Sequence, residues 1–160
     1  MSSGGAVRGG PRLEAMPVAE IRVELGEPLD FGETRDGRRR FTPVLGGELC
    51  AMPGEGAELL GIGRLRAEIL PGGGDRQLVR VDAAVEIDAR YSARTGGGGL
   101  IGIRAVGVRV PAAQDGPPYF RVQVRFETAE PEFAELQRAF FVADGHRDAS
   151  EVRHVVHLIR

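Results

Sequence analysis

The sequence contains no lysine, no asparagine and no tryptophan, and it has a single cysteine, Cys50. Because all 21 basic residues are arginine, a Walker-type phosphate loop, which needs a lysine, is excluded. One cysteine excludes an internal disulfide framework and a cysteine-based zinc cluster. Only four serines occur, and none lies in a Gly-x-Ser-x-Gly motif. These absences argue against covalent catalysis.

Long apolar runs and a strong net charge are also missing. No stretch of about 18 apolar residues occurs, and the N-terminus lacks the apolar segment of a signal peptide. A net charge of -2 gives no general attraction to nucleic acid or to an anionic membrane. We therefore expect a cytoplasmic protein whose partner is a small molecule.

A chain of 160 residues is most simply one domain. Residues 1–17 are rich in Gly, Ser, Ala and Pro and predict a disordered tail, which leaves 18–160 as the domain. Short runs with strand-like patterning follow, separated by turn signals. The predicted strands are residues 19–25, 39–45, 58–70, 77–94, 100–110, 119–127, 138–143 and 152–160.

About eight strands with short connections predict an all-β fold. A single closed or nearly closed antiparallel barrel is favoured, with a sandwich as the alternative. One short helix is expected near the C-terminus, over residues 131–138, where Phe133, Leu136 and Phe140 have helical spacing.

The cluster Gly72-Gly73-Gly74 invites comparison with a phosphate-binding loop, which lies between a strand and a helix. Here a strand pattern follows, so we predict a hairpin turn, and the same holds for the four glycines at 96–99. Asp75 comes directly after the first cluster. We expect it to cap its own turn, with a role at the mouth of a barrel as the alternative.

Alternation divides the strand predicted over residues 77–94 into an apolar face and a charged face. The charged face is either solvated or lines a partly polar barrel interior, where Asp88 and Arg90 would meet a ligand. An arginine beside a carboxylate keeps that carboxylate ionised. The strand 119–127 repeats the pattern, with Tyr119, Arg121 and Glu127 on one face, and the same two interpretations apply.

Three histidines occur late in the chain. His154 and His157 lie on opposite faces of the last predicted strand, so they would not both ligate one metal ion. His146 follows Asp144-Gly145 and is expected in a loop. We expect neither a metal nor a cofactor.

Several short motifs occur in a definite order and spacing along the chain. They are Gly37-Arg38-Arg39-Arg40, Leu70-Pro71-Gly72-Gly73-Gly74-Asp75, Ile87-Asp88-Ala89-Arg90-Tyr91, Tyr119-Phe120-Arg121, Phe126-Glu127-Thr128 and Phe140-Phe141-Val142. This pattern resembles the DUF3237 family, also called UPF0311, of small bacterial and fungal β-barrel proteins. The resemblance implies an antiparallel barrel with one short helix, a homodimer, and relatives among secondary-metabolite genes. Arg76 and the glycines 96–99 depart from the family's usual tryptophan and aspartates.

The remaining carboxylates, arginines and tyrosines suit proton transfer and electrostatic stabilisation. We predict a cofactor-independent isomerase, cyclase or lyase that acts on a small, mostly apolar metabolite inside the barrel. The alternatives are a non-catalytic binding barrel and an interaction protein without a ligand cavity. The predicted catalytic residues are Asp88, Glu127 and Tyr91, and the predicted substrate-binding residues are Arg40, Asp75, Arg90, Tyr119 and Arg121.

Overall fold

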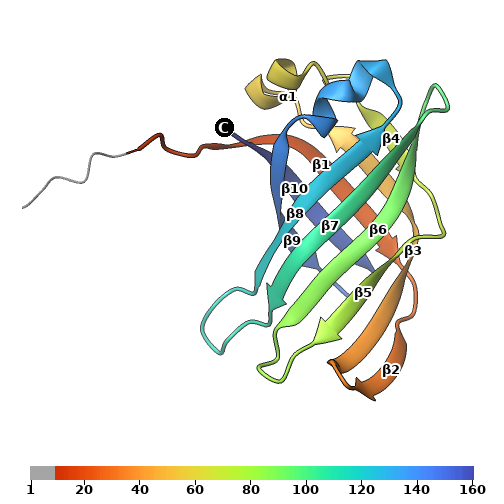
Figure 1. Cartoon of the computed structure of the whole chain (residues 1–160), viewed down its shortest axis with the longest axis vertical. Coiled ribbons are helices and arrows are strands. Elements are labelled where there is room, and N and C mark those ends of the chain that lie inside the picture. The colour runs from red at the N-terminus through yellow and green to blue at the C-terminus, as the bar shows by residue number, and fades with distance from the viewer. Residues whose placement is uncertain (1–9) are drawn as a thin grey trace, which may run out of the picture.

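In the computed structural model, which describes residues 10–160, the chain forms a closed antiparallel β-barrel with eight strand positions (Figure 1). The fold class predicted from the sequence is confirmed. The strands are β1 (Ala15–Leu25), β2 (Leu29–Thr34), β3 (Gly37–Ala51), β4 (Arg66–Ile69), β5 (Gly74–Val79), β6 (Val85–Thr95), β7 (Leu100–Val110), β8 (Tyr119–Thr128), β9 (Phe140–Arg147) and β10 (Glu151–Ile159).

The barrel closes because β1 pairs with β10 on one side and with β3 on the other. The strands β4 and β5 share one position between β3 and β6. β4 pairs with residues 47–50 of β3, whereas β5 pairs with residues 38–43. β2 forms a hairpin with the lower part of β3. Closure leaves no exposed barrel edge along most of the sheet.

Two short helices lie at the same end of the barrel in Figure 1. One is α1 (Glu55–Leu60) and the other is η1 (Pro131–Gln137), a 3-10 helix. η1 is the helix expected near the C-terminus, and Pro131 begins it as a proline at the first helical position commonly does. Phe133 and Leu136 of η1 are buried, so this helix closes the barrel end with apolar side chains.

Some predicted boundaries are wrong. Residues 58–70 do not form one strand, because α1 occupies their beginning and only β4 remains extended. The strand predicted over 77–94 is instead the hairpin of β5 and β6. It turns at residues 80–84, where the Asp82 carboxylate accepts a hydrogen bond from the Ala84 N–H at 3.1 Å. This turn contains no glycine or proline, so the alternating pattern predicted one continuous strand across it.

At other positions, glycines led to predicted strand ends or hairpins that the structure does not have. Gly46 and Gly47 lie inside β3 rather than at the end of a strand. Gly47 has a φ of 134°, and its Cα faces the backbone of Arg22 so closely that a Cβ atom would overlap it. The Gly72–Gly74 cluster joins β4 to β5, which are not paired with each other, so it is a turn but not a hairpin. The glycines 96–99 do form the predicted hairpin turn.

The predicted tail of residues 1–17 falls partly outside the described residues, which begin at residue 10. Within the described part, residues 15–17 belong to β1. His146, expected in a loop, lies in β9.

Candidate functional site

A small cavity lies inside the barrel, toward the end opposite the helices. Its volume is about 30 Å³, which is room for about two water molecules. One part of its wall is apolar and includes Val44, Ile87 and Phe120. The other part is polar and is formed by Asp75, Gln77, Tyr91, Arg147 and His154.

Asp75 is the carboxylate of this cavity and is 9% exposed. It lies on β5 and does not cap a turn, so that prediction is wrong. Its Oδ2 accepts a hydrogen bond from Gln77 Nε2 at 2.8 Å, and its Oδ1 accepts one from the Asp88 N–H at 3.1 Å. Burial raises the pKa of Asp75, and these two hydrogen bonds together with Arg147 and Arg109 oppose the rise. A buried carboxylate whose raised pKa is limited by hydrogen bonds and nearby arginines is a candidate proton acceptor.

Tyr91, on β6, lies close to Asp75 on the inner face of the barrel. Asp75 is paired with Ala89, so Tyr91 is its diagonal neighbour across the strands. The Tyr91 hydroxyl is buried and has no hydrogen-bond partner among the described residues. Burial, and then the charge of Asp75, raise the pKa of Tyr91 far above its usual value. The phenol therefore stays protonated and is available as a hydrogen-bond donor.

The glycine cluster makes room for this tyrosine. A Cβ atom on Gly73 would lie 2.4 Å from the backbone carbonyl oxygen of Arg90 and 2.6 Å from the Cβ of Tyr91, closer than such atoms can approach. Gly73 has no positive φ, so the close approach, rather than backbone conformation, accounts for the glycine. The motif that resembles a phosphate loop thus serves the packing around Tyr91.

Three arginines reach the same end of the barrel interior. Arg40, Arg109 and Arg147 come from β3, β7 and β9, and each has the same parity as the inward-facing residues of its strand. Burial lowers the pKa of Arg109 and of Arg147, and the charge of Arg40 lowers both further. The Nε atoms of Arg40 and Arg109 are buried and lack partners within residues 10–160.

His154 completes the polar wall. The ring is 4% exposed, and its Nδ1 lies 3.0 Å from the backbone carbonyl oxygen of Asp144. A carbonyl oxygen only accepts, so Nδ1 carries the proton and Nε2 is the basic nitrogen of the neutral ring. Burial lowers the pKa of His154 and favours this neutral form. Phe120 packs edge to face on the ring at 5.3 Å, and Gly145 leaves space for Phe120, since a Cβ there would lie 2.6 Å from its ring.

The structure divides the residues predicted for the site into two groups. Arg40, Asp75 and Tyr91 are brought together in the barrel interior, as described above. The other five lie on the outer surface, which corrects the interior location proposed for them. They are Asp88, Arg90, Tyr119, Arg121 and Glu127.

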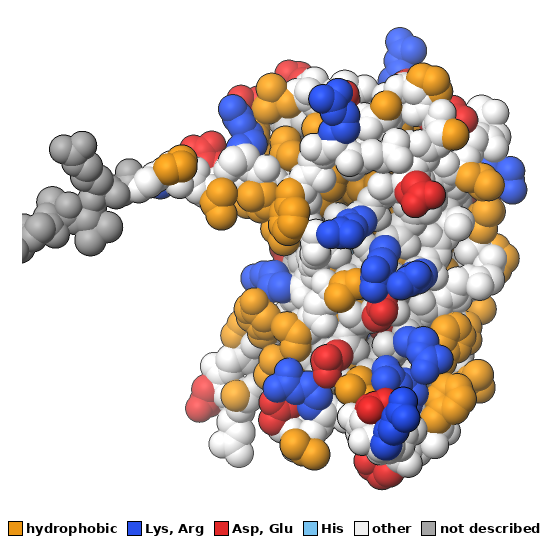
Figure 2. All heavy atoms as spheres, in the orientation of Figure 1, with side chains coloured by type: hydrophobic (Ala, Val, Ile, Leu, Met, Phe, Trp, Pro, Cys, Tyr) orange, Lys and Arg blue, Asp and Glu red, His pale blue; other side chains and the backbone are white. Residues whose placement is uncertain are grey.

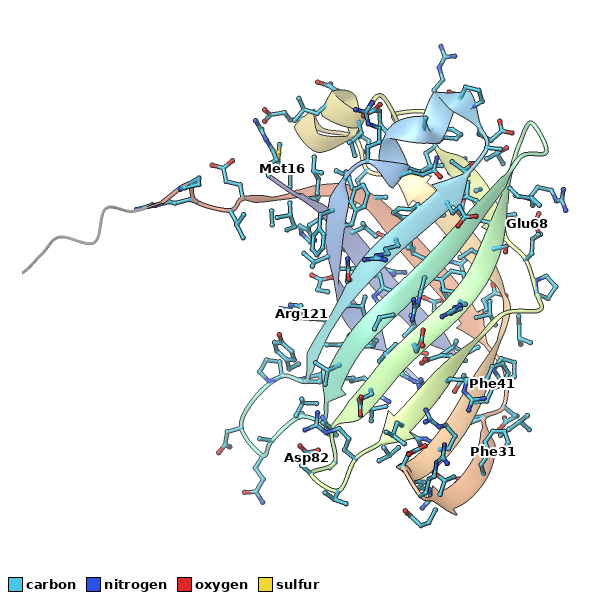
Figure 3. The ribbon with its side chains drawn as sticks, viewed as in Figure 1. Met16, Phe31, Phe41, Glu68, Asp82 and Arg121 are labelled. Atoms are coloured by element: carbon cyan, nitrogen blue, oxygen red, sulfur yellow. The ribbon has the colours of Figure 1, made fainter. Side chains whose placement is uncertain are left out.

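On this outer surface, charges pair with one another in water. Asp88 lies between Arg90 and Arg104, at 3.8 Å and 3.3 Å from their Nε atoms. Arg121, which extends away from the barrel in Figure 3, packs on the Tyr119 ring at 5.3 Å. Basic and acidic side chains are mixed over this face in Figure 2. For these residues the solvated interpretation holds.

Sequence reasoning missed Gln77, Arg109, Arg147 and His154 as members of the interior cluster. A signal was present in the alternation. Arg109 has the same parity as Ile101, Ile103 and Ala105, and Arg147 has that of Phe141 and Ala143. A charged residue in the last position of an apolar strand face points into the barrel near its open end.

A larger groove of about 700 Å³ lies on the outer surface, against β3, β4 and the end of β6. Four arginines and four glutamates line it, and Arg66 pairs with Glu48 at 3.0 Å. Glu68, labelled in Figure 3, is one of its exposed side chains. Charges that are exposed to water contribute little binding free energy, so we place the candidate site in the interior.

Within residues 10–160, no group of three His, Cys, Asp or Glu side chains is arranged to hold a metal ion. In the same part of the chain, no helix has the length and apolar character needed to cross a membrane.

An eight-position β-barrel with an apolar cap at one end and a polar interior site at the other defines the class of protein. Residues 11–159 match the family described as "Protein of unknown function (DUF3237)", and the chain belongs to this family. The resemblance inferred from the sequence motifs is confirmed.

Individual relatives share both sequence and fold. The UPF0311 protein RPA1785 of Rhodopseudomonas palustris is 32% identical over 161 residues, which covers 93% of this chain and 98% of the relative. Its crystal structure has a TM-score of 0.81 at 29% identity and covers 94% of this chain and 100% of that one.

Two fungal proteins are more distant. PR-toxin biosynthesis cluster protein 7 of Penicillium roqueforti is 35% identical over 88 residues, 52% of this chain and 46% of the relative. An enzyme from Penicillium herquei has a TM-score of 0.66 at 15% identity, with 98% of this chain and 99% of that one covered. At that identity the likeness concerns the fold alone.

Proposed function

We propose that the protein is a cofactor-independent enzyme of secondary metabolism, an isomerase, cyclase or lyase that converts a small, mostly apolar metabolite inside the barrel. The single observation that carries this proposal is the interior cluster. A buried carboxylate, a protonated tyrosine, a neutral histidine and Arg147 line the cavity beside an apolar wall, and Arg40 and Arg109 lie near them at the same end of the barrel. Buried titratable groups with shifted pKa values gather where acid–base chemistry is performed.

In the proposed mechanism Asp75 is the general base. It takes a proton from a carbon or hydroxyl group of the substrate, and its raised pKa brings its basicity closer to that of the acid it deprotonates. The Tyr91 hydroxyl donates a hydrogen bond to the oxygen that becomes negative. Arg40, Arg109 and Arg147 stabilise that charge electrostatically. Asp75, protonated by this step, returns the proton to the substrate at another position, and His154 Nε2, which is unprotonated in the neutral ring, is a second acceptor in the site.

The apolar half of the barrel accounts for the rest of the substrate. Val44, Ile87 and Phe120 offer an apolar wall for a hydrocarbon body, while the polar groups fix its orientation. Since the cavity of about 30 Å³ is too small for a metabolite, the substrate enters by displacing the half-buried arginine side chains at the open end of the barrel.

The relatives support the same class of function. One sequence relative is named as a member of a toxin biosynthesis cluster, and one protein of the same fold is called an enzyme. Neither name identifies a substrate for this chain.

The test uses a metabolite extract from a strain that lacks the gene, treated with purified protein and followed by liquid chromatography and mass spectrometry. We expect one compound to be converted into a product, and Asp75→Asn to slow that conversion by about 10²-fold or more. Asp88→Asn, which removes a carboxylate from the outer surface, is the matched control and should convert at the normal rate. Equal rates for wild type and Asp75→Asn would contradict the assignment of the base.

A non-catalytic binding barrel is the second candidate. The buried polar atoms without partners favour a bound ligand whether or not it reacts. In that case a compound from the extract would be retained by the protein and released unchanged, and Asp75→Asn would alter retention without any product appearing.

A further inference from the structure

The three interior arginines carry an inference about the chemical class of the ligand. It deepens the proposed function and rests on the interior cavity being the site. Asp75 is the one buried carboxylate among the charges that act on Arg109 and Arg147, while the other carboxylate beside Arg147, Asp148, is exposed. His154 is held neutral by burial. The described interior therefore carries excess positive charge.

This charge is not neutralised by ion pairs. No ion pair within 4.0 Å involves Arg40, Arg109 or Arg147 anywhere in residues 10–160. The outer arginines behave differently, since Arg22, Arg38, Arg66 and Arg104 each have a carboxylate within that distance. Like charges that are half-buried side by side are unfavourable unless a group of opposite charge compensates them.

Unsatisfied donors point to the same conclusion. Four buried polar atoms in the described chain lack partners: Arg40 Nε, Thr42 Oγ1, Tyr91 OH and Arg109 Nε. Each of them has a hydrogen to donate. Thr42 is 1% exposed and Tyr91 6% exposed, so bulk water does not satisfy them. A group with several acceptor oxygens would satisfy these donors and the charge together.

From these observations we infer that the ligand of the interior site is an organic carboxylate with an apolar body. Its carboxylate lies among Arg40, Arg109 and Arg147, because the flat guanidinium group donates two parallel hydrogen bonds to a carboxylate. Its body lies against Phe120 and Ile87, toward the apolar half of the barrel. Asp75 then faces the substrate carbon skeleton rather than the carboxylate, which it would repel.

The test compares two probes that differ in charge and share their shape, trans-cinnamate and trans-cinnamamide, with inorganic phosphate as a third probe. Binding is measured by isothermal titration calorimetry on the full chain. We expect cinnamate to bind and cinnamamide to bind roughly tenfold to a hundredfold more weakly, since charge-assisted hydrogen bonds are lost. Equal binding of the two, or tighter binding of phosphate than of cinnamate, would overturn the inference.

Variants locate the binding. Arg109→Gln and Arg147→Gln should each weaken cinnamate binding, whereas Arg121→Gln on the outer surface should leave it unchanged. Asp75→Asn should strengthen it, because the one repelling carboxylate is removed. Unchanged binding in both interior arginine variants would also overturn the inference. If these variants do not fold, as judged by circular dichroism, the comparison of cinnamate with cinnamamide on the wild type still decides.

The outcomes separate this inference from the proposed function. Selective cinnamate binding without conversion of any compound in the extract would leave the carboxylate site standing and remove the enzyme proposal. Conversion of an uncharged compound without selective cinnamate binding would do the reverse.

Discussion

The two halves of the barrel interior are filled by different kinds of side chain. Beneath the helices the interior is apolar, with Phe126 and Phe141 packed edge to face at 5.3 Å and with Leu49 and Ile101 fully buried. At the other end Asp75, Gln77 and Tyr91 lie among three arginines. The apolar half gains free energy by removing hydrocarbon from water. The polar half leaves buried donors unsatisfied, which costs stability and is retained where function requires it.

This difference predicts that the apolar half determines stability and that the polar half determines activity. Substitutions in the apolar half should lower stability and affect activity only through unfolding. Substitutions of the unsatisfied groups in the polar half should preserve or raise stability and reduce activity, as is common at active sites.

The largest effect is expected in the apolar half, for Phe141→Ala. Phe141 is 0% exposed, and its removal should lower the free energy of unfolding by about 3–5 kcal/mol. Phe140→Ala, one residue earlier and 53% exposed on the outer face, is the matched control, with an expected loss of about 0.5 kcal/mol. Urea unfolding measures both. Losses of similar size would mean that Phe141 does not hold the core.

A smaller loss is expected at the boundary between the halves, for Gly73→Ala. The added methyl group would lie 2.4 Å from the Arg90 carbonyl oxygen and 2.6 Å from the Tyr91 Cβ, so the strands must separate locally at a cost of about 1–3 kcal/mol. Gly63→Ala is the control, since nothing lies within 4 Å of its Cβ position and its φ is not positive. Thermal unfolding of the two variants compares them. If Gly73→Ala is as stable as Gly63→Ala, the close approach to Tyr91 is not a constraint.

In the polar half, Tyr91→Phe should raise the free energy of unfolding, whereas the substitutions above lower it. This change removes a buried hydroxyl that has no partner and keeps the ring, so the free energy of unfolding should rise by about 1 kcal/mol. Turnover should fall by about 10²-fold, because the donor to the developing negative charge is lost. Urea unfolding and the rate of conversion in the extract give the two numbers. Reduced stability with normal turnover would place the hydroxyl in a structural role.

The smallest effect concerns pH and His154. The folded protein lowers the pKa of this ring below its usual value of about 6.5, so the unfolded chain binds a proton at a higher pH than the folded one. The stability contributed by the neutral ring is complete above pH 6.5 and is lost as the pH falls through the lowered pKa. Unfolding curves between pH 7 and pH 5 should show this loss.

His154→Gln should remove that part of the pH dependence, whereas His157→Gln, on the outer face of the same strand, should keep it. An identical pH dependence in wild type and His154→Gln would contradict the role assigned to the buried ring.

Alternation and turn residues were enough to predict the fold class and most strands. β7, β8 and β10 lie close to their predicted ranges, because each has a regular period of two and is bounded by glycine, proline or a charged turn. β2 was missed, since all its residues except Gly32 are exposed and no alternation marks it. α1 was missed because its six residues are too few to show a helical period.

The site was harder to predict, because the chemistry that the sequence presents most visibly lies outside. Asp88 and Arg90 form a conspicuous pair on β6, yet an exposed pair of this kind contributes little. The interior group is assembled from one or two residues on each of β3, β5, β6, β7, β9 and β10, and its outermost members, Arg40 and His154, are 114 positions apart in the chain. Arg40, Asp75 and Tyr91 lie in motifs that marked them, whereas Gln77, Arg109, Arg147 and His154 have no sequence neighbour that marks them as functional.

The sequence by itself determined the barrel, its family and the two faces of each strand, because these follow from local periodicity and from motifs within short stretches. Only the tertiary structure decided which face meets solvent and which charged side chains share the interior. Closure of the sheet turned the apolar face of each strand inward and carried Asp75, Tyr91 and the three arginines with it. The reason is geometric. Alternation gives each strand two faces, but the barrel has an interior only because β1 pairs with β3 and closes the sheet.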